Sequence, residues 1–244
     1  MAITSTQTAP PYRVAFLLID GFALMSFASA SEPLRAANLL AGQPLYEVHY
    51  LSTDGQAARS SGGALIPVTA ALDPAADFAL VLVVAGGDPT NFRDKHVFRW
   101  LRRMAQRGAT LGGVSGGPVI LAAAGLMRGY RMTVHWEHRA ALQELYPELL
   151  LQTALYVMDR QRITCAGGTA PLDLLHALLA RQRGRPLRAG SATGSCIPPC
   201  ARPATRNAPD WPNATPPTAS RCCWRWKPWK TIRPTRWIWH NWRP

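Results

Sequence analysis

Short apolar runs alternate with helix-like segments through most of this chain. Runs of strand length occupy residues 14–19, 46–52, 78–85, 110–114, 151–158 and 162–166. Segments with helical spacing or capping signals occupy residues 29–40, 94–106, 118–124, 136–145 and 171–181. Glu32 and Pro33 are expected in the first turn of the first helix. The alternation predicts an α/β fold, a flavodoxin-like doubly wound and mostly parallel sheet with helices on both faces.

The segment at residues 94–106 carries the clearest helix signals. Asp94 can cap its first turn and Gly108 can end it. Val97, Leu101 and Met104 recur at i, i+4 and i+7, so they share one face and are expected to pack against the sheet. The opposite, solvated face is expected to carry three arginines, Arg102, Arg103 and Arg107.

Composition changes sharply near residue 187. Residues 187–244 contain 7 of the 9 Trp, 4 of the 5 Cys and 10 of the 21 Pro. They hold 10 basic and 1 acidic side chains, net +9, whereas residues 1–186 hold 17 and 13, net +4. Four Leu or Ile side chains are too few to build a core in this stretch. We predict a flexible N-terminus at residues 1–12, one globular domain at 13–186 and an unstructured basic tail at 187–244.

The unusual composition of this tail has three possible explanations. Tryptophans interleaved with Arg and Lys at residues 224–230 could bind nucleic acid by charge and stacking. Four cysteines and His240 could bind zinc, although their spacing matches no standard motif. We favour a frameshift near residues 184–190, because the preceding frame with GC-rich codons converts residues 221–226 into a leucine-rich string. Sequencing the gene across this stretch tests that hypothesis.

The amino-terminal apolar run is not a typical secretion signal. Residues 13–31 have one basic residue before the run, but Asp20 and Gly21 split it in two. No apolar run approaches the roughly 20 residues that a membrane span requires. Cys165 is the only cysteine before residue 196, so nothing requires an oxidising compartment. We expect a cytoplasmic protein that does not contact a membrane.

Glycine pairs follow three of the predicted strands. They are Gly86 with Gly87, Gly116 with Gly117, and Gly167 with Gly168. In an open parallel sheet, ligands bind at the edge where the strands end, and glycines let backbone N–H groups approach them. Helix starts near Gly117 and Thr169 would favour a carboxylate or another small anion. The alternative is that tight strand-to-helix turns require glycine in any case.

Residues 113–117 match the G-x-S-x-G pattern between a strand and a helix, a turn that exposes one side chain to substrate. Ser115 is therefore the candidate nucleophile. A serine hydroxyl requires a base, for which His135 or His176 is available, with Glu137 or Asp159 to orient the imidazole. Spacing enforces neither assignment, so a structural or ligand-contacting Ser115 is the alternative.

No metal site or cofactor is expected. His135, Glu137 and His138 have poor ligand spacing, because His135 is expected to end a strand and residues at i and i+3 share a face only within a helix. Cys165 ends an apolar strand and is expected to be a small buried side chain. Trp136 follows His135 closely enough to line a crevice at the strand ends.

Five motifs in residues 13–185 are distinctive together. They are Gly21-Phe22 with residues 32–38, residues 84–87, residues 121–126 with Gly129, residues 133–138, and residues 165–174. They resemble the PfpI-like, class I glutamine amidotransferase-like domains that form the amino-terminal half of AraC-family transcriptional regulators. The resemblance implies an α/β domain that senses a small metabolite, such as an amino acid or a betaine-like compound, and that acts as a homodimer.

The resemblance also implies a role for Ser115, which lies at the sharp strand-to-helix turn of residues 113–117, here called the elbow. Enzymatic relatives place a nucleophilic Cys there, supported by an acidic residue and often a His, whereas this chain has Ser115. An unassisted hydroxyl is much less nucleophilic than a partly ionised thiol, so a non-catalytic pocket is implied. The residues expected to line it are Gly86, Gly87, Ser115, Gly116, His135, Trp136 and Gly167.

An enzyme is the alternative reading. It would be a PfpI-like hydrolase, amidase or glyoxalase that uses Ser115, with His135 and Glu32 as the other catalytic candidates. Turnover that disappears in Ser115→Ala would favour it. In the regulator reading, DNA is bound only by intact relatives, through a carboxy-terminal helix-turn-helix half that is not recognisable in this sequence.

Overall fold

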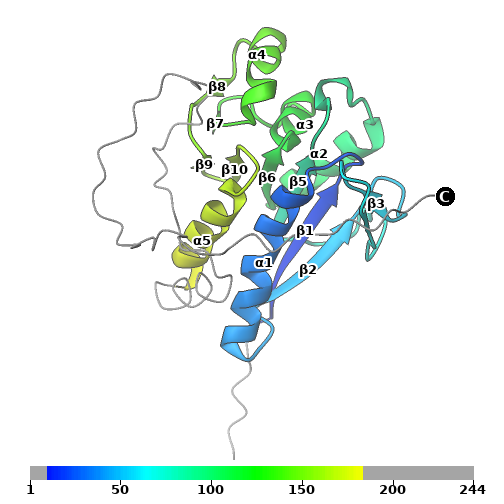
Figure 1. Cartoon of the computed structure of the whole chain (residues 1–244), viewed down its shortest axis with the longest axis vertical. Coiled ribbons are helices and arrows are strands. Elements are labelled where there is room, and N and C mark those ends of the chain that lie inside the picture. Colours follow the sequence, from blue (N-terminus) through cyan, green and yellow to red (C-terminus); the bar gives the residue numbers. More distant parts are fainter. Residues whose placement is uncertain (1–9, 184–244) are drawn as a thin grey trace, which may run out of the picture. The chain divides into compact units, whose positions relative to one another are not determined.

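The computed structural model describes residues 10–183 of the chain. A six-stranded sheet forms the centre of this domain (Figure 1). Its strands, in spatial order, are β2 (Tyr46–Leu51), β1 (Tyr12–Leu18), β5 (Leu80–Ala85), β6 (Thr110–Ser115), β10 (Arg162–Cys165) and β9 (Tyr156–Asp159). All neighbours are parallel except β9, which runs antiparallel to β10. The five parallel strands follow the flavodoxin order 2-1-3-4-5, so the predicted fold class is confirmed.

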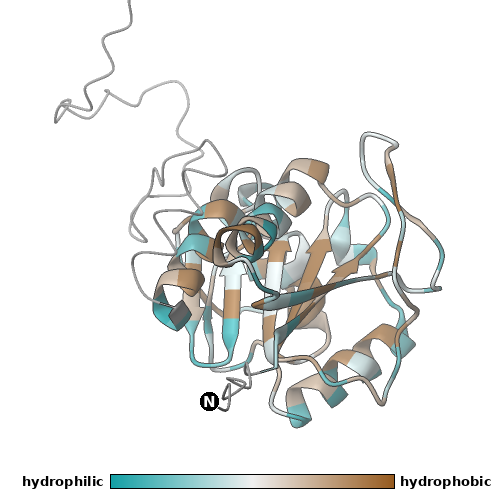
Figure 2. Cartoon of the chain, turned by 90° about the horizontal axis from the view of Figure 1, so that it is seen from below, coloured by the Kyte–Doolittle hydropathy of each residue, from teal (hydrophilic) through white to brown (hydrophobic). Residues whose placement is uncertain are grey.

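Helices cover both faces of this sheet. They are α1 (Leu24–Ala41) and α5 (Ala170–Arg183) on one face, and α2 (Lys95–Gln106) and α3 (Gly117–Ala123) on the other. Side chains of β1 alternate between the two cores: Val14 and Phe16 pack with α1 and α5, whereas Ala15 and Leu17 pack on the opposite side. Figure 2 shows the apolar colour of the strands enclosed between helical layers.

Smaller elements lie at the loops. They are the hairpin of β3 (Ala58–Arg59) and β4 (Leu65–Ile66), the 3-10 helix η1 (Pro89–Asn91), the pair β7 (Arg131–Met132) and β8 (Leu150–Leu151), and α4 (Trp136–Leu145). The β3–β4 hairpin was not expected, because two-residue strands carry no readable alternation. No helix in residues 10–183 is long and apolar enough to cross a membrane.

The predicted helix α2 is confirmed together with its cap. The Asp94 carboxylate accepts hydrogen bonds from the backbone N–H groups of His96 and Val97, at 2.8 and 3.2 Å. Val97, Leu101 and Met104 are all buried. The cap satisfies two N–H groups that no carbonyl of the helix can reach, which is why the start of this helix was readable from sequence.

The start of α1 corrects the sequence prediction. The helix begins at Leu24, five residues before the expected start, so Glu32 and Pro33 lie in its middle rather than in its first turn. Its N-cap residue is Ala23, which makes no side-chain capping bond. Without a capping side chain, the sequence carries no signal for this helix end.

The run at residues 151–158 is also different from the prediction. It does not form one strand: β8 ends at Leu151 and pairs with β7, and β9 begins at Tyr156 and pairs with β10. Between them, the Thr133 hydroxyl donates to the Ala154 carbonyl at 2.7 Å. The two ends of this apolar run thus pair with different strands, β7 and β10. The periodicity of the sequence does not reveal such a division.

The predictions about the basic tail at residues 187–244, including its disorder, nucleic-acid and zinc readings and the frameshift, fall outside the described residues. The same holds for residues 1–9 of the expected flexible N-terminus. β1 begins at Tyr12, the last residue of that expected segment.

Candidate functional site

The chain order reverses between β1 and β5, the position where doubly wound proteins commonly bind ligands. Gly86 follows β5 there, and a Cβ on it would lie 2.6 Å from the Gly21 carbonyl oxygen. Close packing of the two backbones therefore explains this glycine. Gly87 has φ +60° with open space around its Cα, so the next position remains accessible. Ser115 lies one strand further along, at the end of β6.

Ser115 ends β6 in a left-handed conformation, with φ +59°. Such a conformation in a non-glycine residue costs roughly 1–3 kcal/mol and persists only where the surrounding structure enforces it. The backbone N–H of Gly116 donates to the Ala85 carbonyl at 3.0 Å, which holds the turn against β5. A Cβ on Gly116 would lie 2.9 Å from Pro89 Cγ, so glycine is required by packing. The strained elbow predicted at Ser115 is present.

The third glycine pair, Gly167 and Gly168, lies in a loop that contacts Ser115. A Cβ on Gly167 would lie 2.8 Å from Ser115 Cβ and 2.9 Å from its Oγ, so Gly167 packs directly on the elbow. The N–H of Gly168 donates to Ser26 Oγ at 2.8 Å, which ties this loop to the first turn of α1. Ser26 is fully buried, and its role could not be predicted from local sequence because it lies 142 residues from its partner.

Cys165 lies beneath the elbow and is fully buried, as expected. Burial raises the pKa of its thiol to about 12, although hydrogen bonds from the backbone N–H groups of Gly167 and Ser115 oppose the shift. A thiol that stays protonated is a poor nucleophile. Cys165 therefore acts as a packing residue that also accepts two backbone N–H groups.

His135 approaches the elbow through its backbone. It is the N-cap residue of α4, not the end of a strand as predicted, and its N–H donates to the Ser115 carbonyl at 3.3 Å. Its buried Nδ1 lies 3.5 Å from Glu137 Oε2, a distance that allows charge attraction without hydrogen-bond geometry. The ring lies 5.7 Å from that of Trp136, whose side chain is about half exposed at 49%.

A second histidine and an aspartate stand near this group. The imidazole of His138 is 5.8 Å from that of His135, and its pKa is lowered first by burial and then by the charge of His135. The pKa of Asp88 is lowered mainly by a hydrogen bond from the Thr90 hydroxyl. Asp88 also accepts from Asn91 Nδ2 at 2.6 Å, so its carboxylate is engaged in shaping η1.

The remaining catalytic candidates are elsewhere. Glu32, whose side chain is half exposed, pairs with Arg35 at 2.7 Å on the surface of α1. Asp159 accepts from the backbone N–H of Arg131 at the far edge of the sheet. His176 is fully buried within α5. In residues 10–183, His135 Nδ1 has no hydrogen-bond partner, so it does not accept from the Ser115 hydroxyl. Within the same residues, no group of three or more potential ligand side chains is placed to hold a metal ion.

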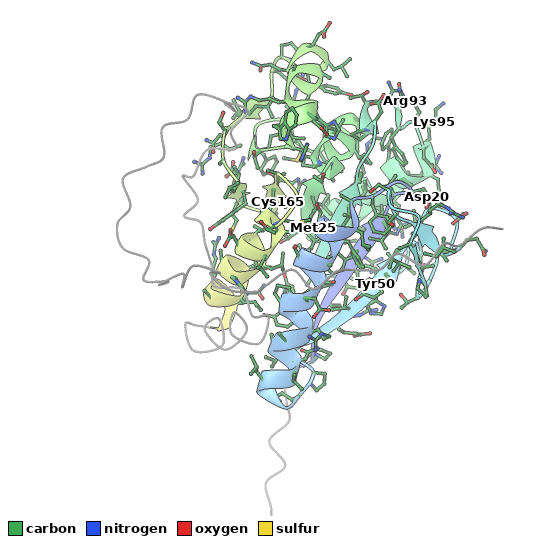
Figure 3. The ribbon with its side chains drawn as sticks, in the orientation of Figure 1. Asp20, Met25, Tyr50, Arg93, Lys95 and Cys165 are labelled. Atoms are coloured by element: carbon green, nitrogen blue, oxygen red, sulfur yellow. The ribbon has the colours of Figure 1, made fainter. Side chains whose placement is uncertain are left out.

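Apolar side chains rim this end of the sheet. Met25 is 62% exposed and precedes Ser26, which holds the Gly168 loop. Trp136 follows His135, which holds the Ser115 carbonyl. Figure 3 shows Met25 at the start of α1 and Cys165 at the end of β10, at the same end of the domain. Met25 and Trp136 are therefore exposed apolar side chains, each next to a residue that holds the elbow or its neighbouring loop.

The same residues match a known family. The model of the DJ-1/PfpI family covers residues 12–181. The chain belongs to this family. The parallel sheet of this DJ-1/PfpI domain and the sharp elbow at Ser115 both lie within the matched residues.

Several curated relatives of this DJ-1/PfpI domain are transcriptional regulators. The chain is 45% identical over 181 residues to the HTH-type transcriptional regulator GlxA of Rhizobium meliloti. This match covers 74% of this chain and 56% of GlxA. It is 44% identical over 184 residues to the HTH-type transcriptional regulator GbdR of Pseudomonas aeruginosa. This match covers 75% of this chain and 50% of GbdR. The chain thus spans about half the length of the curated relatives it matches.

Solved structures agree with the family assignment. An AraC family transcriptional regulator from Pseudomonas putida superposes with a TM-score of 0.69 at 32% identity, over 75% of this chain and 98% of that one. Drosophila melanogaster DJ-1beta superposes with a TM-score of 0.66 at 19% identity, over 78% and 100%. The second likeness shows the fold alone.

Proposed function

We propose that this DJ-1/PfpI domain is the metabolite-sensing part of an AraC-type transcriptional regulator, acting in the cytoplasm. The observation that carries the proposal is the match of 44–45% identity to two HTH-type regulators across the whole domain. DNA binding would belong to the part of such regulators that lies outside the match. In an intact dimer, a ligand would act by binding one DNA-binding arrangement more tightly than the other.

The geometry of the elbow supports binding without turnover. Acyl-transfer chemistry at such an elbow uses the N–H of the residue after the nucleophile to stabilise an oxyanion. Here that N–H belongs to Gly116, and it donates to the Ala85 carbonyl. Within the described residues, the Ser115 hydroxyl also makes no hydrogen bond to His135 Nδ1, which has no partner. A hydrolase that uses Ser115 would need both features, so the enzyme reading is the weaker one.

The lining suggests a small zwitterion, an amino acid or a betaine-like compound. Ser115 Oγ and the His135 imidazole would bind its carboxylate, with Gly87 leaving open backbone beside them. The exposed ring of Trp136 would face its ammonium group, because a cation is attracted to an aromatic face. Gly86, Gly116 and Gly167 would shape this pocket from behind, since packing already accounts for each of them.

A ligand screen on the full chain tests the proposal. Amino acids and trimethylammonium carboxylates are added at millimolar concentration, and the melting temperature is measured. Binding at 100 times Kd adds about 2.7 kcal/mol to the free energy of unfolding, which is easily detected. Trp136→Ala should weaken the binding more than tenfold, whereas Leu145→Ala, which removes another half-exposed side chain of α4, should not.

Two outcomes would contradict the proposal. One is a screen in which no zwitterion stabilises the protein. The other is hydrolase, amidase or glyoxalase turnover that is present in the wild type and lost in Ser115→Ala, which would establish the enzyme reading instead.

A further inference from the structure

The outward face of α2 carries an unusual concentration of positive charge. Four arginines and one glutamine line an open hollow of about 460 Å³ on this face, namely Arg99, Arg102, Arg103, Gln106 and Arg107. All five side chains are exposed. The opposite face of the helix is buried in the core, so the four guanidinium groups are held on one side of a fixed element.

Among the described residues, these four guanidinium groups have no carboxylate partner. Within residues 10–183, no acidic side chain lies within ion-pair distance of any of them, whereas Arg13, Arg35, Arg128 and Arg131 each pair with an acid. Side chains three and four positions apart on a helix are neighbours, so like charges there repel and destabilise it. A bound anion would remove that repulsion, which gives the cluster an affinity for negative charge.

Two of the four arginines are anchored to the scaffold. Arg102 Nε donates to the Ala124 carbonyl at 2.8 Å, and Arg107 donates to the Pro74 carbonyl at 3.3 Å. Each guanidinium has five N–H donors, so four remain after one such bond. A group that is already positioned loses less conformational entropy when it binds a ligand. Arg99 and Arg103 make no side-chain hydrogen bond within the described part of the chain.

We propose that this hollow binds a small polyanion that carries two or three linked phosphate groups. Its volume lies in the range of small-molecule sites, about 300–1,000 Å³. From Arg99 to Arg107 the helix rises about 12 Å, so the four guanidinium groups are spread over a greater length than a single phosphate can contact. Arginine binds phosphate oxygens in a bidentate fork, and four such forks match several oxyanions.

The hollow is separate from the metabolite site proposed at Ser115. Arg102 reaches the carbonyl of Ala124, which follows α3 at the end away from Ser115. A duplex nucleic acid is the less suitable occupant, because its interfaces bury about 1,000–2,500 Å² of protein surface and extend well beyond one helix face. The two ligands of this domain would therefore bind at different positions, and the polyanion site does not depend on the metabolite site.

The test uses the full chain and inorganic triphosphate, with binding measured by calorimetry at constant ionic strength. Arg99→Gln/Arg103→Gln removes two charges without breaking a hydrogen bond within the described residues. Arg59→Gln/Arg181→Gln removes two exposed charges on other elements, again without breaking a side-chain hydrogen bond within the described residues, and serves as the matched control. We expect triphosphate affinity to fall at least tenfold in the first variant and less than twofold in the second, with monophosphate binding at least tenfold weaker than triphosphate in the wild type.

A third variant separates charge from geometry. Arg99→Lys/Arg103→Lys keeps both charges but loses the planar forks, and we expect it to recover only part of the affinity. Equal losses in the test and control pairs would overturn the proposal, since binding would then follow net charge. It would equally fail if a 20-base-pair DNA duplex, and not triphosphate, lost affinity in the α2 variant, because the surface would then be a nucleic-acid contact. Far-UV circular dichroism confirms that each variant is folded.

Discussion

Gly167 lies so close to Ser115 that a Cβ on the glycine would sit 2.8 Å from the serine Cβ. Gly167 also has φ +93°, a backbone conformation that residues with a side chain rarely adopt. The loop after β10 and the turn after β6 therefore support one another. The left-handed Ser115 is maintained by this contact and by the bond from Gly116 to Ala85.

Gly167→Ala is expected to destabilise the domain by about 2–4 kcal/mol, because it adds both backbone strain and an overlap with Ser115. Gly42→Ala is the matched control: Gly42 has φ +62° but open space around its Cα, so only strain of about 1 kcal/mol is expected. Urea unfolding measures both. Similar losses in the two variants would show that the contact with Ser115 contributes nothing.

Cys165 is expected to resist alkylation in the folded protein. Its pKa is raised to about 12 by burial, so roughly one thiol in ten thousand is ionised at pH 8. Iodoacetamide treatment followed by peptide mass spectrometry should find this cysteine modified at least a hundredfold more slowly than in guanidinium chloride. Rapid native modification would mean that the floor beneath Ser115 opens to solvent.

The same thiol makes stability depend on pH in the alkaline range. The unfolded thiol ionises near pH 9.0 while the folded one stays protonated until about 12, so this stabilising contribution is complete below pH 9 and is lost as the pH rises. Cys165→Ala should show a shallower decline in the free energy of unfolding between pH 9 and 11. An unchanged decline would contradict the assignment.

His138 should make the domain less stable in mild acid. Its pKa is lowered chiefly by burial, so below about pH 6.5 the unfolded chain takes up a proton that the folded chain does not. The free energy of unfolding should therefore fall as the pH decreases from 7 to 5. His138→Gln should flatten this slope, whereas His96→Gln, which changes an exposed histidine at the start of α2, should leave it as in the wild type.

Asp94→Ala is expected to cost about 1 kcal/mol of stability, because two backbone N–H groups at the start of α2 lose their acceptor. Asp77→Ala removes the same charge from an exposed loop and should change stability by less than 0.5 kcal/mol. Thermal unfolding distinguishes the two. Equal effects would indicate a response to net charge and not to capping.

Local chemistry made much of the fold predictable. The cap at Asp94, the continuous apolar run of β1 and the glycine pairs after three strands all act over a few residues, so they can be read along the chain. Prediction was poor where two partners compete or where no cap exists. The split of residues 151–158 into β8 and β9 and the early start of α1 at Leu24 are the two examples.

The sequence by itself determined the doubly wound class, the family and the presence of an elbow at Ser115, because these follow from local patterns. Only the tertiary structure decided which side chains meet there. It brought Ser26 to Gly168 and His135 to Ser115, and it placed Glu32 on the surface beside Arg35. The physical reason is that strand order in the sheet, not distance along the chain, decides which loops lie together at its edge.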